Sequence, residues 1–366
     1  MKSAVPRQPV EASTPTTLRL DGEEYLAFAG CNYLGLAHHP AVRRAVVETL
    51  ETLGLSSAAS RETSGNHLHH ERLEQALAEF LGVEEVLLLP NGYLADLALL
   101  QGLTDRVEVV LVDADAHPSL FDAARLADKQ LMDFGPGDLE RAGALIERHA
   151  GRGLAVLTDG CFPMRGRVAP SAELLALLPE HGTLVIDDSH GLGVLGERGG
   201  GSLELAGIAD PRAVLTFSLG KALGAAGGAI AGSATVISAV RRRSDVYVAS
   251  TPIPPPLAAA AVAALDVLQS EPQRVERLQA NCAHLHQLGR RLGLDVGDPQ
   301  LPVLTVPVQD SAAGENVHES LRARGVFVPL VRYPGGPEAG LLRVGITSEH
   351  TAAHLLRLER ALEEVL

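Results

Sequence analysis

The sequence predicts an α/β fold with a mainly parallel sheet, followed by a smaller α+β lobe. Short, fully apolar runs alternate with helical patterns between residues 85 and 231. Strands of that kind are buried on both faces of a parallel sheet. After Val240 the pattern changes to one long helical region and then to short strands and helices. The units we expect are an N-terminal arm and hairpin at 1–38, which is free to pack with the last unit, a large domain at 39–250 and a small domain at 251–366.

The N-terminal elements follow from local signals. Residues 1–16 are polar and proline-rich, and we expect a mobile arm there. Asp21–Gly22 separates two apolar stretches, which is a hairpin signal. Pro40 opens a predicted helix to about residue 53, because proline is tolerated at the first helical position. The stretch 54–66 is predicted to be a loop, and the spacing of apolar residues predicts a helix from Leu68 to Leu81.

The remaining elements alternate in type. Helical patterns at 119–127 and 172–178 lie between predicted strands, and a single helical region is expected at 257–292. The predicted strands of the large domain are 86–89, 109–112, 154–157, 184–186, 214–217 and 229–231. The predicted strands of the small domain are 303–306, 326–328 and 342–345.

Composition excludes several classes of function. With 31 basic and 45 acidic residues the net charge is −14, which argues against a nucleic-acid partner. The apolar runs are too short to cross a bilayer, so no membrane association is expected. Cys31, Cys161 and Cys282 lie far apart and lack metal-ligand spacing. Reduced thiols of this kind, together with a polar N-terminus, are typical of a cytoplasmic protein without a metal site.

One lysine stands out from the other basic residues. Only Lys2, Lys129 and Lys221 are lysines among the 31 basic residues, and Lys221 lies in the apolar and hydroxyl-rich stretch LTFSLGKALGAAGGAI. Arginine matches lysine as a surface charge but cannot form a Schiff base. Lys221 is therefore a candidate nucleophilic amine, although alone it is equally well explained as a surface lysine at a helix end.

Two interpretations compete for the strand that ends at Asp187. Gly191, Gly193 and Gly196 match the GxGxxG pattern of dinucleotide-binding dehydrogenases, which requires a helix opening on the glycines. Here the glycines continue into the stretch 197–202, ERGGGS, which is a poor helix start. Alternatively, Asp187 and His190 lie where ligands bind in an open α/β sheet. Asp187 could then keep a ring nitrogen protonated, and His190 could bind another ring substituent.

The spacing of Asp187 and Lys221 suits a pyridoxal-phosphate site, in which a lysine forms the Schiff base and an aspartate partners the pyridine nitrogen. The stretch Pro90–Ala95 joins a predicted strand to a helix, and its backbone amides at the helix N-terminus would offer a site to a phosphate. Ser218 could add a hydroxyl, and His117 is placed to stack on a flat ring. Singly, each is also explained as an ordinary turn, a buried hydroxyl or a surface histidine. It is their joint occurrence that favours the cofactor.

Several motifs occur together in the order of a known family. They cover roughly residues 25–360, and resemble the α-oxoamine synthase family of fold-type-I pyridoxal-phosphate enzymes. The matching motifs are NYLGLAHHP at 32–40, SSAASRETSGNHLHHERLE at 56–74, NGYLAD, DAHPSL, TDGCFPMRG, DDSHGLGVLGERGGGS, TFSLGKALG, YVASTPIPP at 247–255 and LLRVGIT at 341–347. The resemblance implies a fold-type-I transferase with a seven-stranded, mainly parallel sheet in its cofactor-binding domain.

The resemblance also implies roles for individual residues. Lys221 would form the Schiff base, Asp187 would pair with the pyridine nitrogen, and His117 and His190 would contact the ring and its phenolic oxygen. The residues implied to hold the cofactor are Lys221, Asp187, His190, His117, Gly92, Tyr93, Leu94 and Ser218, with Ser250 and Thr251 supplied by the partner chain of a homodimer. The residues implied to bind substrate are Arg343, which suits a carboxylate, Asn32 and His70.

The implied reaction is the decarboxylating condensation of an amino acid with an acyl-CoA to give an α-amino ketone. A protonated His190 could polarise the new carbonyl. Alternatives on the same fold are an aminotransferase or other amino-acid enzyme, and a catalytically silent partner subunit, which the presence of Lys221 argues against. The sequence departs from the family pattern at four positions, where Pro163 replaces a serine, Arg165 an acid, Asp96 an asparagine and Gly200 an arginine. Pro163 can offer the cofactor oxygen no hydroxyl.

Overall fold

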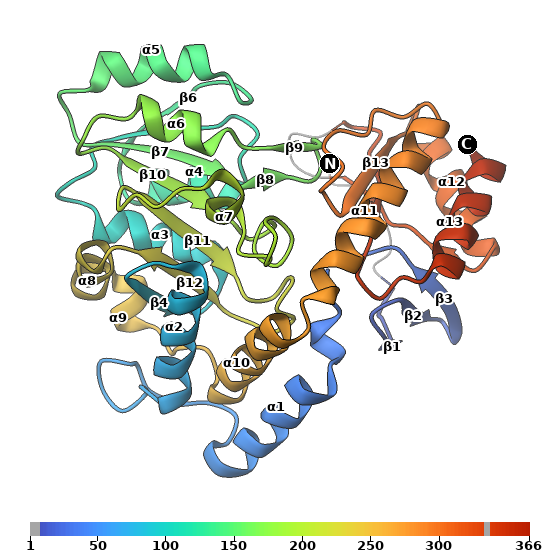
Figure 1. Ribbon diagram of the computed structural model, residues 1–366, viewed down its shortest axis with the longest axis horizontal. Helices are drawn as coiled ribbons and strands as arrows, with labels where there is room; N and C mark the ends of the chain where they lie inside the picture. Colours follow the sequence, from blue (N-terminus) through green and yellow to red (C-terminus); the bar gives the residue numbers. More distant parts are fainter. Residues whose placement is uncertain (1–7, 333–336) are drawn as a thin grey trace.

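The computed structural model describes residues 8–332 and 337–366. Its centre is a seven-stranded sheet in the order β4-β12-β11-β10-β7-β5-β6 (Figure 1). The strands from β11 to β6 are parallel, and β12 runs antiparallel to both neighbours. The strand bounds are β4 Glu85–Leu89, β5 Val109–Val112, β6 Gln130–Asp133, β7 Leu154–Asp159, β10 Thr183–Asp187, β11 Ala213–Ser218 and β12 Gly228–Gly232. The mainly parallel sheet and its six predicted strands are confirmed.

Strand β6 was not predicted. It pairs with β5 at the edge of the sheet, and its two terminal residues, Gln130 and Asp133, are exposed. Only two apolar residues lie between them, so the strand lacks the continuous apolar run of its buried neighbours.

Helices cover both faces of the large sheet, because successive strand residues point into two separate apolar cores. In β4, Val86 and Leu88 belong to one core, and Leu87 and Leu89 belong to the other. The helices over the first core include α2 Leu68–Leu81, α5 Leu139–His149, α6 Ser171–Leu177 and α7 Ser202–Ala206. The helices over the second core are α3 Gly92–Gly102, α4 Pro118–Leu126, α8 Ala234–Arg243 and the short α9 Asp245–Ala249.

A smaller lobe lies beside the large sheet, at the right of Figure 1. Its three-stranded sheet has the order β13-β16-β15. The strands are β13 Val303–Pro307, β15 Leu330–Val331 and β16 Leu341–Gly345. The helices are α11 Gln273–Arg291, α12 Ser311–Ala323 and α13 Ala352–Val365. The predicted strands at 303–306 and 342–345 are thus confirmed.

The N-terminal hairpin packs with this smaller lobe. Strands β2 Thr17–Leu20 and β3 Glu23–Ala27 form the predicted antiparallel pair, joined by Asp21–Gly22 with positive φ at both residues. Strand β14, Val326–Phe327, adds to β3 in parallel. The expected mobile arm is wrong at Ala12–Ser13, which pairs with β2 as β1, and residues 1–7 lie outside the described part.

The helical region predicted at 257–292 is two helices rather than one. Helix α10, Pro255–Ser270, packs against α1, Pro40–Leu53, and against α2, whereas α11 lies with the smaller lobe. The break falls at Glu271–Pro272. Proline has no amide hydrogen and disfavours helical dihedrals at the preceding residue, which explains the break.

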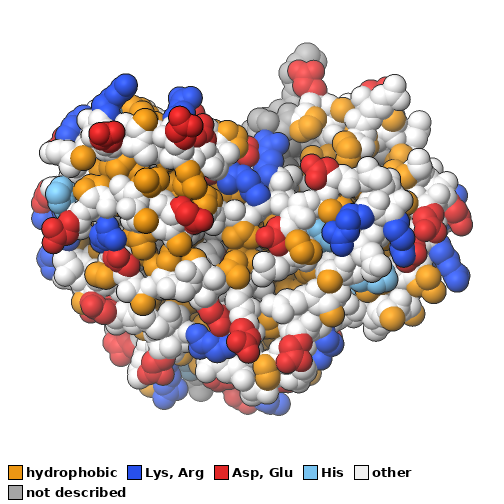
Figure 2. Space-filling view, turned by 45° about the horizontal axis from the view of Figure 1, so that its top comes forward, with side chains coloured by type: hydrophobic (Ala, Val, Ile, Leu, Met, Phe, Trp, Pro, Cys, Tyr) orange, Lys and Arg blue, Asp and Glu red, His pale blue; other side chains and the backbone are white. Residues whose placement is uncertain are grey.

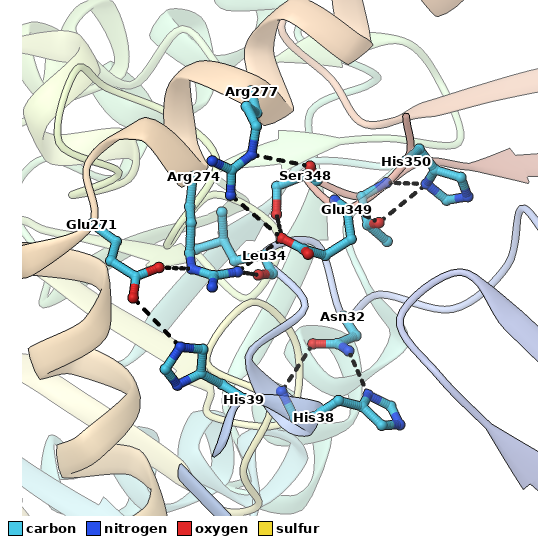
Figure 3. A network of polar contacts seen from close by, with 12 residues as sticks. Asn32, Leu34, His38, His39, Glu271, Arg274, Arg277, Ser348, Glu349 and His350 are labelled. Carbon is cyan, nitrogen blue, oxygen red and sulfur yellow. Dashed lines mark hydrogen bonds and ion pairs between the residues drawn. The ribbon is translucent and has the colours of Figure 1, made fainter. Parts of the chain in front are cut away.

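A polar network ties the segment after β3 to α11 and to the loop after β16 (Figure 3). Arg274 is the centre of this network, and its side chain is only 11% exposed. The guanidinium donates to Glu271 at 2.7 Å, to Glu349 at 2.8 Å and to the Leu34 carbonyl at 3.1 Å. Short helix η1, Leu36–His38, follows this anchored segment. The network therefore fixes the chain around residue 34 against the smaller lobe.

We expect Arg274→Met to lower the free energy of unfolding by about 2–3 kcal/mol, because it leaves a carbonyl and two carboxylates without their buried donor. Denaturant unfolding of the purified variant measures the loss. Arg277→Met is a matched control, since Arg277 is 47% exposed and lies 3.5 Å from the same Glu349. Exposed pairs contribute roughly 0–1 kcal/mol. Equal losses of unfolding free energy in the two variants would contradict the conclusion that Arg274 is the main stabilising residue of this network.

The surface carries both signs of charge. On the face shown in Figure 2, acidic and basic side chains are interspersed with apolar and uncharged ones. Within residues 8–332 and 337–366, no helix combines the length and apolarity needed to cross a bilayer.

Candidate active site

A cavity of about 650 Å³ lies at the carboxyl ends of the parallel strands, between the large sheet and the smaller lobe. It brings together eight of the predicted site residues. These are Gly92, Tyr93, His117, Asp187, His190, Ser218, Lys221 and Arg343. Strand ends β10 and β11 supply Asp187 and Ser218, whereas Arg343 comes from β16 of the smaller lobe. Ligands bind at this edge of an open α/β sheet, as the sequence predicted.

A turn suited to an anion opens helix α3. Asn91 caps this helix, and its side chain accepts a hydrogen bond from the Leu94 amide at 2.9 Å. The Leu94 amide is therefore occupied, and Leu94 does not line the cavity. The amides of Gly92 and Tyr93 precede the first intrahelical bond and face no helical carbonyl. A side chain at Gly92 would approach Ser218 to 3.0 Å, so glycine permits the close contact between this turn and β11.

Lys221 lies on the tight loop that follows β11. The loop is closed by backbone bonds from Ala225 to the Leu219 carbonyl at 3.0 Å and from Gly224 to the Lys221 carbonyl at 2.9 Å. Gly224 has a φ of +64°, and a Cβ there would lie 2.2 Å from the Ala37 amide nitrogen. The loop that carries the amine is thus fixed against the anchored N-terminal segment.

Three acidic side chains lie close together at the floor of the cavity, and two of them, Asp187 and Asp159, line it. Asp187 and Asp159 end adjacent strands and are paired in register, and Asp96 lies on α3 behind them. Burial, followed by the negative charge of Asp187, raises the pKa of Asp96 to about 8 and raises the pKa of Asp159 well above its ordinary value. The protonated forms of Asp96 and Asp159 are thereby favoured. Asp187 lines the cavity at the end of β10.

His117 caps helix α4 at the cavity wall. Its backbone amide donates to Asp159 at 2.9 Å, and its Nδ1 atom lies 2.7 Å from the Ser119 hydroxyl. Burial lowers the pKa of His117. The neutral ring is thus fixed in orientation by backbone and hydroxyl contacts, which suits a stacking role.

His190 is joined to Arg343 through a buried phenol. The Tyr33 hydroxyl lies 2.8 Å from Nδ1 of His190, and Arg343 donates to the Tyr33 oxygen at 3.4 Å. Burial raises the pKa of Tyr33 well above its ordinary value, so the phenol keeps its proton. Because the guanidinium can only donate, the phenol proton is available to His190. We therefore predict that Nδ1 of His190 accepts this proton in a hydrogen bond and that the proton of the neutral ring is on Nε2.

The surroundings of His190 do not favour the protonated ring that was expected. Burial, followed by the positive charges of Lys221 and Arg343, holds the pKa of His190 well below its ordinary value. The neutral form of the ring is thereby favoured.

Comparison with known proteins identifies the family. Residues 23–362 match the family described as aminotransferase class I and II. A Nitrosococcus oceani 8-amino-7-oxononanoate synthase is 35% identical, covering 98% of this chain and 96% of the relative. An 8-amino-7-oxononanoate synthase from Halorhodospira halophila is 39% identical, and the match covers 95% of this chain and 87% of that relative. A Sphingomonas wittichii serine palmitoyltransferase structure superposes with a TM-score of 0.92 at 26% identity. The superposition covers 98% of this chain and 91% of that structure.

The chain belongs to the aminotransferase class I and II family. Within it, the resemblance to the α-oxoamine synthases is confirmed by these relatives. The fold-type-I architecture agrees with a Francisella tularensis 8-amino-7-oxononanoate synthase structure, which has a TM-score of 0.80 at 22% identity. The dinucleotide interpretation is not supported, because residues 188–201 form turns and helix α7 begins only at Ser202.

Four further residues expected from the synthase resemblance do not line the cavity. Asn32 instead binds the Ala37 amide at 3.2 Å and lies 3.4 Å from His38 (Figure 3). His70 is fully buried and 2.8 Å from the Ile253 carbonyl, so it has no surface to offer a substrate. Ser250 bonds to the Val246 carbonyl, and Thr251 is exposed. The part expected of Ser250 and Thr251 in a neighbouring chain stays a prediction.

The sequence did not assign roles to two residues of this synthase-type site. Tyr33 lies inside the motif NYLGLAHHP, but nothing local indicates that its hydroxyl reaches a histidine 157 positions away. Asp159 ends an apolar strand as Asp187 does, and that shared position was the available signal.

We expect Tyr33→Phe to lower kcat/KM by about tenfold, because it removes one hydrogen bond that fixes the tautomer of a reacting group. The ¹⁵N shifts of the His190 ring should change from the Nε2–H form to a mixture of tautomers. Tyr25→Phe is the control, since Tyr25 lies on β3 and contacts Arg322 at 3.4 Å. Unchanged His190 shifts in Tyr33→Phe would refute the tautomer assignment.

Proposed function

We propose that this protein is a pyridoxal-phosphate-dependent C-acyltransferase of the 8-amino-7-oxononanoate synthase type. It would condense an amino acid with an acyl-CoA and release CoA, carbon dioxide and an α-amino ketone. The observation that carries the proposal is the placement of Lys221, Asp187 and Arg343 on the wall of one cavity. An amine, a carboxyl group to partner the ring nitrogen and a carboxylate-binding guanidinium are the three groups that this chemistry requires.

The donor set fits the cofactor. The open amides of Gly92 and Tyr93, with the Ser218 hydroxyl beside them, suit a phosphate at a helix N-terminus. Ser218 accepts from the Gly220 amide at 3.1 Å, so its own hydrogen is available to an anion. The side chain of Asp187, at the cavity end of β10, suits a ring nitrogen. Pyridoxal phosphate, when bound, supplies an aldehyde and an electron-accepting ring.

We assign a separate role in binding or proton transfer to each of the chain's residues at the cavity. Among the described residues of the cavity wall, Lys221 offers the one primary amine, and we assign to it the covalent attachment and the transfer of the α-proton. Arg343 would hold the carboxylate of the amino acid. His117 would cover one face of the cofactor ring. His190 would donate a hydrogen bond from Nε2 to an oxygen atom in the cavity.

The assembly and the location are also proposals. We infer a homodimer in which Ser250 and Thr251 approach the site of the neighbouring chain, and a cytoplasmic enzyme acting in biotin biosynthesis. An aminotransferase would use the same Lys221, Asp187 and Arg343, so only the reaction distinguishes it. A catalytically silent subunit would have no need of the Lys221 amine.

A CoA-release assay tests the proposal. Holoenzyme is incubated with glycine, alanine or serine and with short, medium or long acyl-CoA or pimeloyl-CoA, and free thiol is measured. We expect thiol only when an amino acid and an acyl-CoA are both present. Amino-group exchange with pyruvate or 2-oxoglutarate, without thiol release, would instead establish an aminotransferase.

A further inference from the structure

The hairpin that follows β7 forms one wall of the cavity. Its strands are β8, Cys161–Phe162, and β9, Arg167–Val168, and its turn spans residues 163–166. Phe162, Pro163 and Met164 line the cavity with apolar surface, and Arg165 follows them on the same wall. An apolar strip that ends in a cation is complementary to a methylene chain that ends in an anion.

Arg165 has guanidinium surface to offer a ligand. Its side chain is 47% exposed, and its Nε atom lies 3.1 Å from Oδ1 of Asp115. Asp115 is shared, because its other oxygen lies 3.6 Å from Arg167. The contact with Asp115 uses Nε and orients the side chain. The side chain also lines the cavity, and a guanidinium is a planar donor whose geometry matches that of a carboxylate.

The turn is held in place by the smaller lobe. The Asp298 amide donates to the Gly166 carbonyl at 2.8 Å, and a Cβ on Gly297 would lie 2.2 Å from that carbonyl oxygen. In Figure 1 the β8–β9 hairpin reaches from the large sheet toward this lobe. Arg165 is therefore mounted on a fixed element rather than on a free loop.

The proposed reaction includes one carboxylate, at the far end of the acyl chain, for which no binding residue has been named above. In 8-amino-7-oxononanoate, the compound in the name of the relatives, the carboxylate is at the opposite end of the chain from the amino ketone. An acyl donor for such a product brings a carboxylate at its far end. Among the described cavity residues the cationic side chains are Lys221, Arg343 and Arg165, and the first two already have roles.

We propose that Arg165 binds the terminal carboxylate of an ω-carboxyacyl donor, with Pro163 and Met164 against its methylene chain. This inference rests on the proposed function. It gives one explanation for two departures from the family pattern, Pro163 and Arg165, because both residues lie on the strip that the acyl chain would contact. The site would thereby select dicarboxylic over monocarboxylic acyl groups.

The test compares two acyl donors of equal length in three proteins. The donors are pimeloyl-CoA and heptanoyl-CoA, and the proteins are the wild type, Arg165→Gln and the control Arg152→Gln. Arg152 is 42% exposed and its Nε lies 3.1 Å from Glu108, so it matches Arg165 in exposure and pairing. We expect the ratio of kcat/KM for pimeloyl-CoA over heptanoyl-CoA to fall about tenfold in Arg165→Gln and to stay unchanged in Arg152→Gln.

A binding measurement keeps this test independent of turnover. Calorimetry of the holoenzyme with free pimelate and free heptanoate should give tighter binding of pimelate, and Arg165→Gln should remove the difference. An unchanged donor ratio, an equal loss for both donors, or no preference for pimelate would overturn the inference. Absence of thiol release with every donor, while pimelate is still preferred, would refute the proposed function and leave the Arg165 site standing.

Discussion

Lys221→Ala will abolish turnover, with a loss of more than about 10³-fold, because no other side chain can replace a positioned amine that both attaches the cofactor and moves a proton. The protein should keep its fold, since Lys221 is on a loop whose closing bonds are between backbone atoms. The variant should also lose the borohydride-fixed cofactor that the wild type retains. Steady-state kinetics and mass spectrometry of the reduced protein measure the two effects.

Lys129→Ala is the matched control for this variant. Lys129 lies outside the cavity and donates to the Val107 carbonyl at 2.8 Å. We expect it to keep both turnover and the fixed cofactor. If cofactor were fixed in Lys221→Ala at another residue, the assignment of the amine would be wrong.

Asp187→Asn is expected to lower kcat by about 10²–10³-fold, comparable to the removal of a preorganised electrostatic group from an active site. Asparagine keeps the size of the side chain and can still accept from the Ser189 amide, which lies 2.9 Å from Oδ1. The loss would therefore report the charge and not the packing. The dissociation constant of pyridoxal phosphate should rise at the same time.

Asp159→Asn distinguishes the two neighbouring carboxyl groups. Asp159 is adjacent to Asp187 in the sheet, but burial raises its pKa and so favours its neutral form, which asparagine resembles. We expect a much smaller fall in kcat than in Asp187→Asn. A loss in Asp159→Asn as large as that in Asp187→Asn would show that the charge has been assigned to the wrong carboxyl group.

Sequence patterns predicted the strands and helices that carry a clear local signal. The strands of the large sheet were predicted from apolar runs, the helix at 40–53 from Pro40 and the helix at 68–81 from its periodicity, and all three signals are local. The break at Pro272 and the edge strand β6 were missed. In the first case a helical pattern on both sides concealed a local proline, and in the second only two apolar residues mark the strand.

For the site, the sequence predicted the residues that follow strand ends, and the cavity gathers them. It could not predict interactions between distant side chains. The neutral state of His190 depends on burial and on Lys221 and Arg343, which come from different elements. The contact of His190 with Tyr33 joins residues 157 positions apart, and no local pattern indicates it.

The fate of the amino acid's carboxyl carbon tests the central claim most directly. Holoenzyme is supplied with pimeloyl-CoA and with alanine labelled at its carboxyl carbon, and labelled carbon dioxide and free thiol are counted together. We predict one labelled carbon dioxide for each thiol, and neither product when alanine or the thioester is omitted. Label that stays in a 2-oxo acid, with the thioester intact, would contradict the assignment of this chain as a decarboxylating acyltransferase.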